Sequence, residues 1–123
     1  MQLQQPNMPF LRVLEYRAFD GGTVFAVEGE LDLGTVEQLQ RPLTDICRRS
    51  DAVTVDLRRV AFLDCVGLRA LLELDEQGAE HNCRVEFIQG PDAVARVFDL
   101  TGTREQLAFV PAISAPPVAV STG

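Results

Sequence analysis

The sequence has no tryptophan, one tyrosine, one histidine and three cysteines among its 123 residues. Cys47, Cys65 and Cys83 are odd in number and form no Cys-x-x-Cys or Cys/His cluster, which argues against a disulfide framework and against a zinc site. A Ser/His or Cys/His catalytic pair would have to be built on His81. We therefore expect reduced thiols, no metal or cofactor, and a protein that is not an enzyme.

Long hydrophobic runs and an excess of positive charge are also missing. No apolar run approaches the roughly 18 residues that a membrane span requires, and residues 1–6 lack the basic and apolar regions of a secretory signal. Eleven basic residues against 18 acidic ones give a net charge of −7, a field that repels nucleic-acid phosphates and anionic lipids. We expect a cytoplasmic protein that binds neither nucleic acid nor a membrane.

The hydrophobic pattern predicts several strands. The turn Asp20-Gly21-Gly22 separates residues 10–19 from residues 23–30 and is typical of a hairpin. Alternating and β-branched residues predict a central strand over 52–57, a further strand over 84–88 and a last edge strand at 109–110. Residues 1–9 and 111–123 are expected to be unpacked tails around one domain at 10–110.

Apolar residues at helical spacing predict three helices between these strands. The first has Pro42 inside it as a local kink, Asp32 or Thr35 as its cap, and one apolar stripe: Val36, Leu39, Leu43, Ile46 and Cys47. The second follows a loop over 58–64, and its expected stripe is Leu68, Leu71, Leu72, Asp75 and Ala79. The third opens at Gly90-Pro91-Asp92, turns Val94, Val97 and Phe98 inward and ends at Gly102; a short turn follows at 103–107.

This order of elements predicts an α/β fold, with a mixed, mostly parallel sheet of four to five strands and three to four helices. Partners and ligands of such sheets collect at loops after the carboxyl ends of strands, here 29–34 and 62–68. Cys65 lies near the start of the second helix, where the helix dipole favours a thiolate and the Asp64 carboxylate opposes it. The alternative for Cys65 is a small, half-buried residue between helix and sheet. A nucleophilic Cys65 lacks a base, because His81 follows about 24 Å along the helix.

Three segments resemble the STAS domain family, the anti-sigma-factor antagonists. Residues 55–68 are similar to the family's signature, residues 29–32 (Gly-Glu-Leu-Asp) to its other short motif, and residues 91–102 to its third helix. The resemblance covers residues 10–110 and implies the STAS fold. It also implies a binding module for partner switching: the unmodified antagonist binds an anti-sigma factor that is also a serine kinase, and the sigma factor is released. Phosphorylation of a Ser or Thr directly after the loop aspartate breaks that complex.

This sequence departs from the family at the phosphoacceptor position, where it has Cys65 followed by Val66. The family's phosphorylation is therefore not expected in this protein, whereas its docking surface is. The resemblance implies that this surface consists of Glu30, Asp32, Leu33, Asp64, Cys65, Val66 and Gly67. One hypothesis is an antagonist that a kinase cannot silence, acting as a monomer or weak dimer. Two alternatives stay open, namely a redox-controlled antagonist through Cys65 and a STAS subunit of a phospholipid or anion transport complex.

Overall fold

The computed structural model describes residues 10–18 and 21–112 and has a five-stranded sheet with three helices. The elements run as β1 (Leu11–Arg17), β2 (Thr23–Leu31), α1 (Val36–Arg49), β3 (Ala52–Leu63), α2 (Cys65–Glu80), β4 (Arg84–Ile88), α3 (Asp92–Thr101), a 3-10 turn (Arg104–Gln106) and β5 (Phe109–Val110). The strand order is β1-β2-β3-β4-β5, antiparallel only between β1 and β2. The predicted α/β class, hairpin and central strand are confirmed. The predicted tail at 1–9 lies outside the described residues, as does the predicted tail at 111–123 apart from residues 111 and 112, which are exposed.

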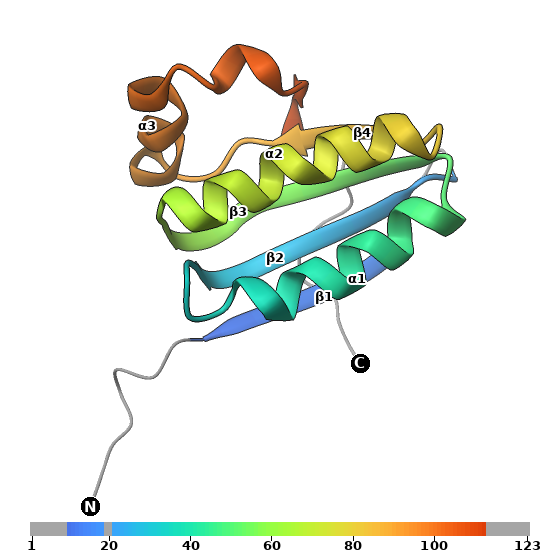
Figure 1. The fold of residues 1–123 in the computed structure, drawn as a ribbon, viewed down its shortest axis with the longest axis horizontal. Coiled ribbons are helices and arrows are strands. Elements are labelled where there is room, and N and C mark those ends of the chain that lie inside the picture. Colours follow the sequence, from blue (N-terminus) through green and yellow to red (C-terminus); the bar gives the residue numbers. More distant parts are fainter. Residues whose placement is uncertain (1–9, 19–20, 113–123) are drawn as a thin grey trace, which may run out of the picture.

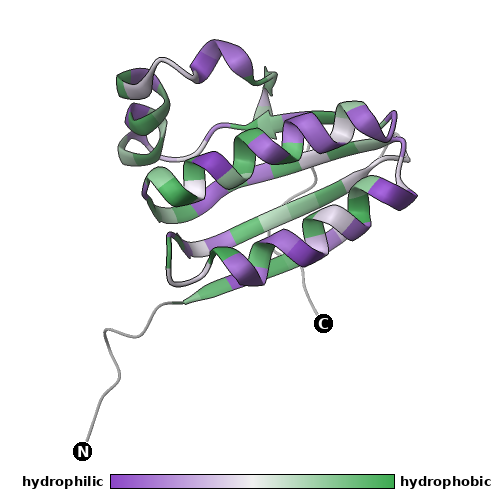
Figure 2. Cartoon of the chain, viewed as in Figure 1, coloured by the Kyte–Doolittle hydropathy of each residue, from purple (hydrophilic) through white to green (hydrophobic). Residues whose placement is uncertain are grey.

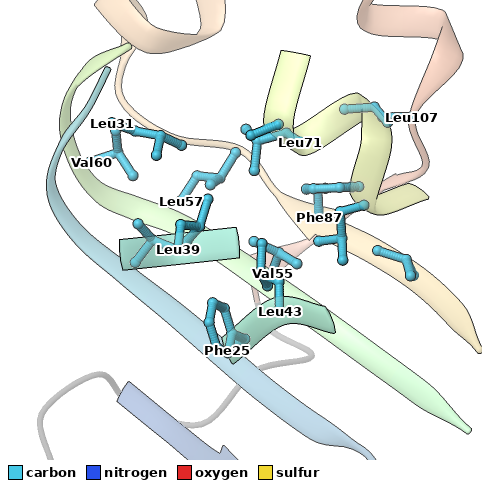
Figure 3. Close-up of a cluster of buried hydrophobic side chains, with 14 of the residues drawn as sticks. Phe25, Leu31, Leu39, Leu43, Val55, Leu57, Val60, Leu71, Phe87 and Leu107 are labelled. Carbon is cyan, nitrogen blue, oxygen red and sulfur yellow. The ribbon is translucent and has the colours of Figure 1, made fainter. Parts of the chain in front are cut away.

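The helices α1 and α2 lie side by side over one face of the sheet (Figure 1). Phe25, Val55 and Phe87 stand opposite one another on β2, β3 and β4, and all three are buried in the main core (Figure 3). The middle of β2 is buried on both faces, as the continuous apolar run at residues 24–27 suggests. In Figure 2, β2 is largely hydrophobic, whereas α1 and α2 are of mixed character. Within the described residues, no helix is long and apolar enough to cross a membrane.

The first and third helices follow their sequence signals. All five residues of the predicted α1 stripe are buried, and the helix runs from Val36 to Arg49 through Pro42. Thr35 occupies the cap position, but its hydroxyl does not cap the helix and donates to the carbonyl oxygen of Glu30 at 2.6 Å. Helix α3 is followed by Gly102 in the left-handed region, at φ +72°, as the sequence predicts.

The predicted loop over 58–64 is wrong, because β3 continues to Leu63 and pairs with β2 as far as Leu31. Two register shifts interrupt this pairing, and they break the strict alternation that marks a strand in the sequence. Arg58 lies within the strand, and its guanidinium donates hydrogen bonds to the buried Asp56 carboxylate at 3.0 and 2.7 Å. Residues two apart share a face of a strand, so this ion pair itself fits extended backbone.

The predicted inner stripe of α2 is also partly wrong. Ala79 is exposed, while Leu72 and Asp75 are only partly buried; the buried residues are Gly67, Leu68, Ala70, Leu71, Leu74 and Gly78. The two glycines explain the difference, because α2 approaches its neighbours where no side chain stands. A Cβ at Gly67 would lie 2.3 Å from the carbonyl oxygen of Leu31, and one at Gly78 would lie 2.5 Å from Val85 Cγ2. A count of apolar side chains does not register such contacts.

Candidate functional site

The Asp64 side chain joins the two loops that the sequence singles out. Its Oδ1 accepts a hydrogen bond from the amide of Gly67 at 2.9 Å and thereby caps α2. Its Oδ2 accepts from the amide of Leu33 at 3.2 Å, in the loop between β2 and α1. The two loops are far apart in the sequence, and this one carboxylate fixes them to each other. The backbone adds a bond from the Asp64 amide to the carbonyl of Leu31 at 3.3 Å.

The loop between β2 and α1 is fixed by its own hydrogen bonds. Asp32 Oδ1 accepts from the amide of Gly34 at 2.9 Å, and the Asp32 carbonyl accepts from the amide of Val36 at 2.9 Å. Thr35 is fully buried beneath the loop. Leu33 stands at the tip of this turn with 72% of its surface exposed.

Cys65 is the first residue of α2 and is exposed, so the alternative of a half-buried residue between helix and sheet is wrong. Val66, beside it, is partly buried and packs against the core. Gly67 is buried, and its lack of a side chain permits the close approach of α2 to β2. We call the seven predicted residues the loop surface: Glu30, Asp32, Leu33, Asp64, Cys65, Val66 and Gly67.

Sequence reasoning missed Phe62, which is 51% exposed at the end of β3. It pairs in register with Glu30 of the loop surface. Phe10 is 50% exposed and reaches the same region, since its carbonyl accepts from the amide of Glu30 at 2.7 Å. The sequence contains a signal for this exposure. Successive side chains of a strand point to opposite faces, so Phe62 points away from the core that its buried neighbour Leu63 faces.

Cys65 and His81 lie at opposite ends of α2. His81 caps the far end of α2, where its Nδ1 lies 2.9 Å from the carbonyl oxygen of Gln77. In the part of the chain that the structure describes, no three His, Cys, Asp or Glu residues are grouped to hold a metal ion. A cavity of about 520 Å³ lies at the opposite end of the sheet, where Arg17, Arg49 and Arg84 are among the residues that line it. The loop surface contributes nothing to this cavity.

Comparison with known proteins gives a consistent result. An anti-sigma factor antagonist from Mycobacterium paratuberculosis matches with a TM-score of 0.76 and 26% identity, over 90% of this chain and 92% of that one. The anti-sigma factor antagonist SpoIIAA matches in its unphosphorylated form with a TM-score of 0.67 and 18% identity, over 82% and 88%. Its phosphorylated form, from Bacillus, matches with a TM-score of 0.62 and 17% identity, over 82% and 91%. At these lower identities the likeness to SpoIIAA concerns the fold alone.

A search of curated proteins finds no match. The neighbours that are anti-sigma factor antagonists are non-enzymatic binding proteins. The family model described as "Mlab, STAS domain" matches residues 14–111, which is most of the chain. This protein therefore belongs to the STAS domain family.

Proposed function

We propose that this protein is an anti-sigma-factor antagonist, which binds an anti-sigma factor of the serine kinase type in the cytoplasm and so releases a sigma factor. The observation that carries the proposal is the Asp64 carboxylate, which fixes both loops of the loop surface through Gly67 and Leu33. Such a surface is ordered before it meets a partner, and less entropy is lost on binding. The likeness to the Mycobacterium paratuberculosis antagonist supports the same function.

The composition of this surface favours a protein partner. Leu33 exposes apolar surface beside the acidic groups Asp32 and Asp64, and Phe62 and Phe10 are about half exposed next to Glu30. Exposed apolar residues supply most of the free energy at protein interfaces, and the surrounding charges select the partner. We expect the partner to present an apolar groove bordered by basic side chains.

Cys65 replaces the hydroxyl residue that a serine kinase would phosphorylate in this family, and its thiol offers no such alcohol. The antagonist would therefore stay competent to bind after exposure to the kinase, and its abundance would control its activity. Incubation with the cognate kinase and ATP is expected to leave the intact mass unchanged. A stable phosphate adduct on Cys65 would contradict this part of the proposal.

Titration calorimetry against each anti-sigma kinase of the same genome tests the proposed partner. A matched pair of exposed leucines sharpens it, because Leu33 is 72% exposed on the loop surface and Leu100 is 79% exposed on α3. We expect Leu33→Ser to weaken binding by at least about tenfold, the size of one lost apolar contact at an interface. Leu100→Ser is expected to leave the affinity unchanged. Equal effects of the two substitutions would move the binding site away from the loop surface.

A redox-controlled antagonist is the first alternative, and it is supported by the exposure of Cys65 at a helix start. The other two cysteines, Cys47 and Cys83, are buried and so are not placed to form a disulfide with an oxidised Cys65, and we rank this alternative second. Mild peroxide should then abolish partner binding in the parent protein and spare a Cys65→Ser variant. Equal loss of binding in both proteins would exclude it.

A STAS subunit of a phospholipid or anion transport complex is the other candidate. The observation in its favour is the family model itself, whose description names Mlab. Co-purification from a lysate separates the two functions, because one predicts an ATP-binding anti-sigma kinase and the other a transporter ATPase. The Leu33→Ser variant serves as the matched control for either partner.

A further inference from the structure

We propose that the C-terminal segment, residues 113–123, docks on the outer face of the sheet, which is the face opposite the helices α1 and α2. This inference goes beyond the proposed function and involves neither Cys65 nor the loop surface. Successive side chains along a strand point to opposite faces of the sheet. Phe25, Val55 and Phe87 stand on the inner face in the main core, so their direct neighbours along the strands belong to the outer face.

The outer face is buried although no helix of the described residues covers it. Val24, Ala26 and Ile88 are 0%, 5% and 2% exposed, and none of the three belongs to the main core. The helices α1, α2 and α3 pack on the inner face, since the main core includes residues of all three. A sheet face that met water directly would carry mainly polar side chains and would expose them. A further segment is therefore needed over this face.

An apolar row crosses the outer face from one edge strand to the other. Its members stand in register on the five strands: Leu14, Ala26, Asp56, Ile88 and Val110. The one charged member, Asp56, is neutralised within the face, because its carboxylate accepts hydrogen bonds from the Arg58 guanidinium at 3.0 and 2.7 Å. An occupant of this row therefore has to be apolar and uncharged. Residues 111–123 contain no charged side chain.

Tyr16 supplies an independent observation on the same face. It pairs in register with Val24, and directly opposite residues of an antiparallel pair share a face of the sheet. Its hydroxyl is buried and has no hydrogen-bond partner among the described residues. A buried hydroxyl without a partner is costly, and a segment laid across the sheet brings backbone carbonyl groups to which this hydroxyl can donate.

The C-terminal segment begins beside this face and is long enough to cross it. The described chain ends at residue 112, two positions after the edge strand β5. Four strand spacings of about 4.8 Å give a path of about 19 Å from β5 to β1, and an extended chain of this length reaches about 36 Å. Pro116 and Pro117 lack backbone amides, which disfavours a sixth strand beside β5 and favours contact through side chains. The composition of residues 111–123 alone predicts an unpacked tail, whereas the buried outer face argues for a docked one.

The test uses the full chain and the fluorescence of Tyr16, its only tyrosine, in a sequence without tryptophan. Acrylamide quenches this fluorescence only as far as it reaches the ring, so quenching reports the cover on the outer face. The double variant Val118→Asp, Val120→Asp puts charges on the apolar part of the segment and is expected to raise the quenching constant at least about twofold, because a charge is costly to bury. The matched control Ser114→Asp, Ser121→Asp adds the same charge at polar positions and is expected to quench as the parent does.

Far-UV circular dichroism verifies that each variant keeps its fold, and the milder pair Val118→Ser, Val120→Ser is expected to raise quenching in the same direction. Equal quenching in the parent and both valine variants would overturn the proposal. Exposure of the tyrosine by Leu3→Asp, Met8→Asp instead would assign the outer face to residues 1–9. Quenching that rises as the parent is diluted would assign it to a second copy of the chain, and either result would also overturn the proposal.

Discussion

The two ends of α2 each stand beside a cysteine, and the sulfur atoms have opposite surroundings. At the first end, Cys65 is exposed and the neighbouring Asp64 carboxylate accepts two backbone hydrogen bonds. At the second end, Cys83 is buried in the hydrophobic core. Polar groups order the first end and leave its apolar side chains in water, whereas apolar packing seals the second.

This difference separates an exposed surface that can bind a protein from a packed cluster around Cys83 that stabilises the fold. Contacts at the first end, such as the exposed Leu33, can be completed by another protein without disrupting the core. Contacts at the second end are already made within the chain, and a partner could reach them only by opening the fold. Each end has a glycine, Gly67 or Gly78, that lets α2 approach the sheet closely. Substitution of these two glycines is the strongest test of the comparison.

Gly67→Ala is expected to lower the free energy of unfolding by about 3 kcal/mol, because the new Cβ would meet a backbone atom, the Leu31 carbonyl oxygen, at 2.3 Å. Gly78→Ala is expected to cost less, about 1–2 kcal/mol, because its nearest atom is a side-chain methyl of Val85 at 2.5 Å, and the Cys83 carbonyl follows at 2.7 Å. Urea unfolding measures both, with Arg69→Ala on the exposed side of α2 as the control. A larger cost at Gly78 would reverse the ranking of the two ends.

The second end should also respond to alkaline pH. Burial raises the pKa of the Cys47 thiol from 9.0 to about 11, with smaller contributions from the Cys83 thiol. The folded state therefore holds this proton more tightly than the unfolded state, and the stability that it contributes is lost as pH rises from 9 to 11. The expected loss is about 2–3 kcal/mol. All eleven basic side chains are arginine, so no lysine titrates in this window.

A Cys47→Ala variant isolates this effect. It should be less stable than the parent at pH 7, and its unfolding midpoint should fall less between pH 9 and 11. The variant keeps the other groups that lie near this end or have a raised pKa: Cys83, Asp51, Arg84 and Tyr16. Any dependence of stability on pH that remains in the variant is due to these groups. Parallel curves for the two proteins would show that Cys47 does not titrate in the fold.

How far the sequence predicts this molecule depends on the type of contact. The α1 stripe and the strand β4 were predicted correctly, since apolar side chains at regular spacing specify them. The end of β3 was missed because register shifts break the alternation, and the packed face of α2 was missed because glycines define part of it. The residues that a strand or helix buries at regular spacing can be predicted from its own sequence. The close approach of two elements depends on both of them and cannot be predicted from either one alone.

The same reasoning applies to the site. Asp64 and Cys65 were placed correctly at the start of α2, because the motif and the helix start coincide in the sequence. The bond from Leu33 to Asp64 joins positions 31 residues apart and has no local signal. The role of the loop surface in docking remains a prediction.

The smallest expected change in stability concerns Asp64, where the effect on binding should exceed the effect on the fold. Asp64→Ala removes the cap of α2 and the bond to Leu33, and we expect a loss of about 1–2 kcal/mol in urea unfolding. Asp64→Asn is more informative, because its amide oxygen can still cap Gly67 while its NH₂ group cannot accept from the Leu33 amide. We expect about 0.5 kcal/mol, since the cap bond is kept.

For a partner, however, Asp64→Asn releases the loop that presents Leu33, and the affinity should fall at least as much as in Leu33→Ser. Asp99→Ala is the matched control, an exposed acidic residue on α3 whose ion pair with Arg104 is at the surface. Calorimetry and urea unfolding of the parent, Asp64→Asn and Asp99→Ala proteins separate the role of the Asp64 carboxylate in binding from its role in stability. If Asp64→Asn bound its partner as the parent does, the order of the first end would matter only to the fold, and the contrast between the two ends of α2 would have no functional meaning.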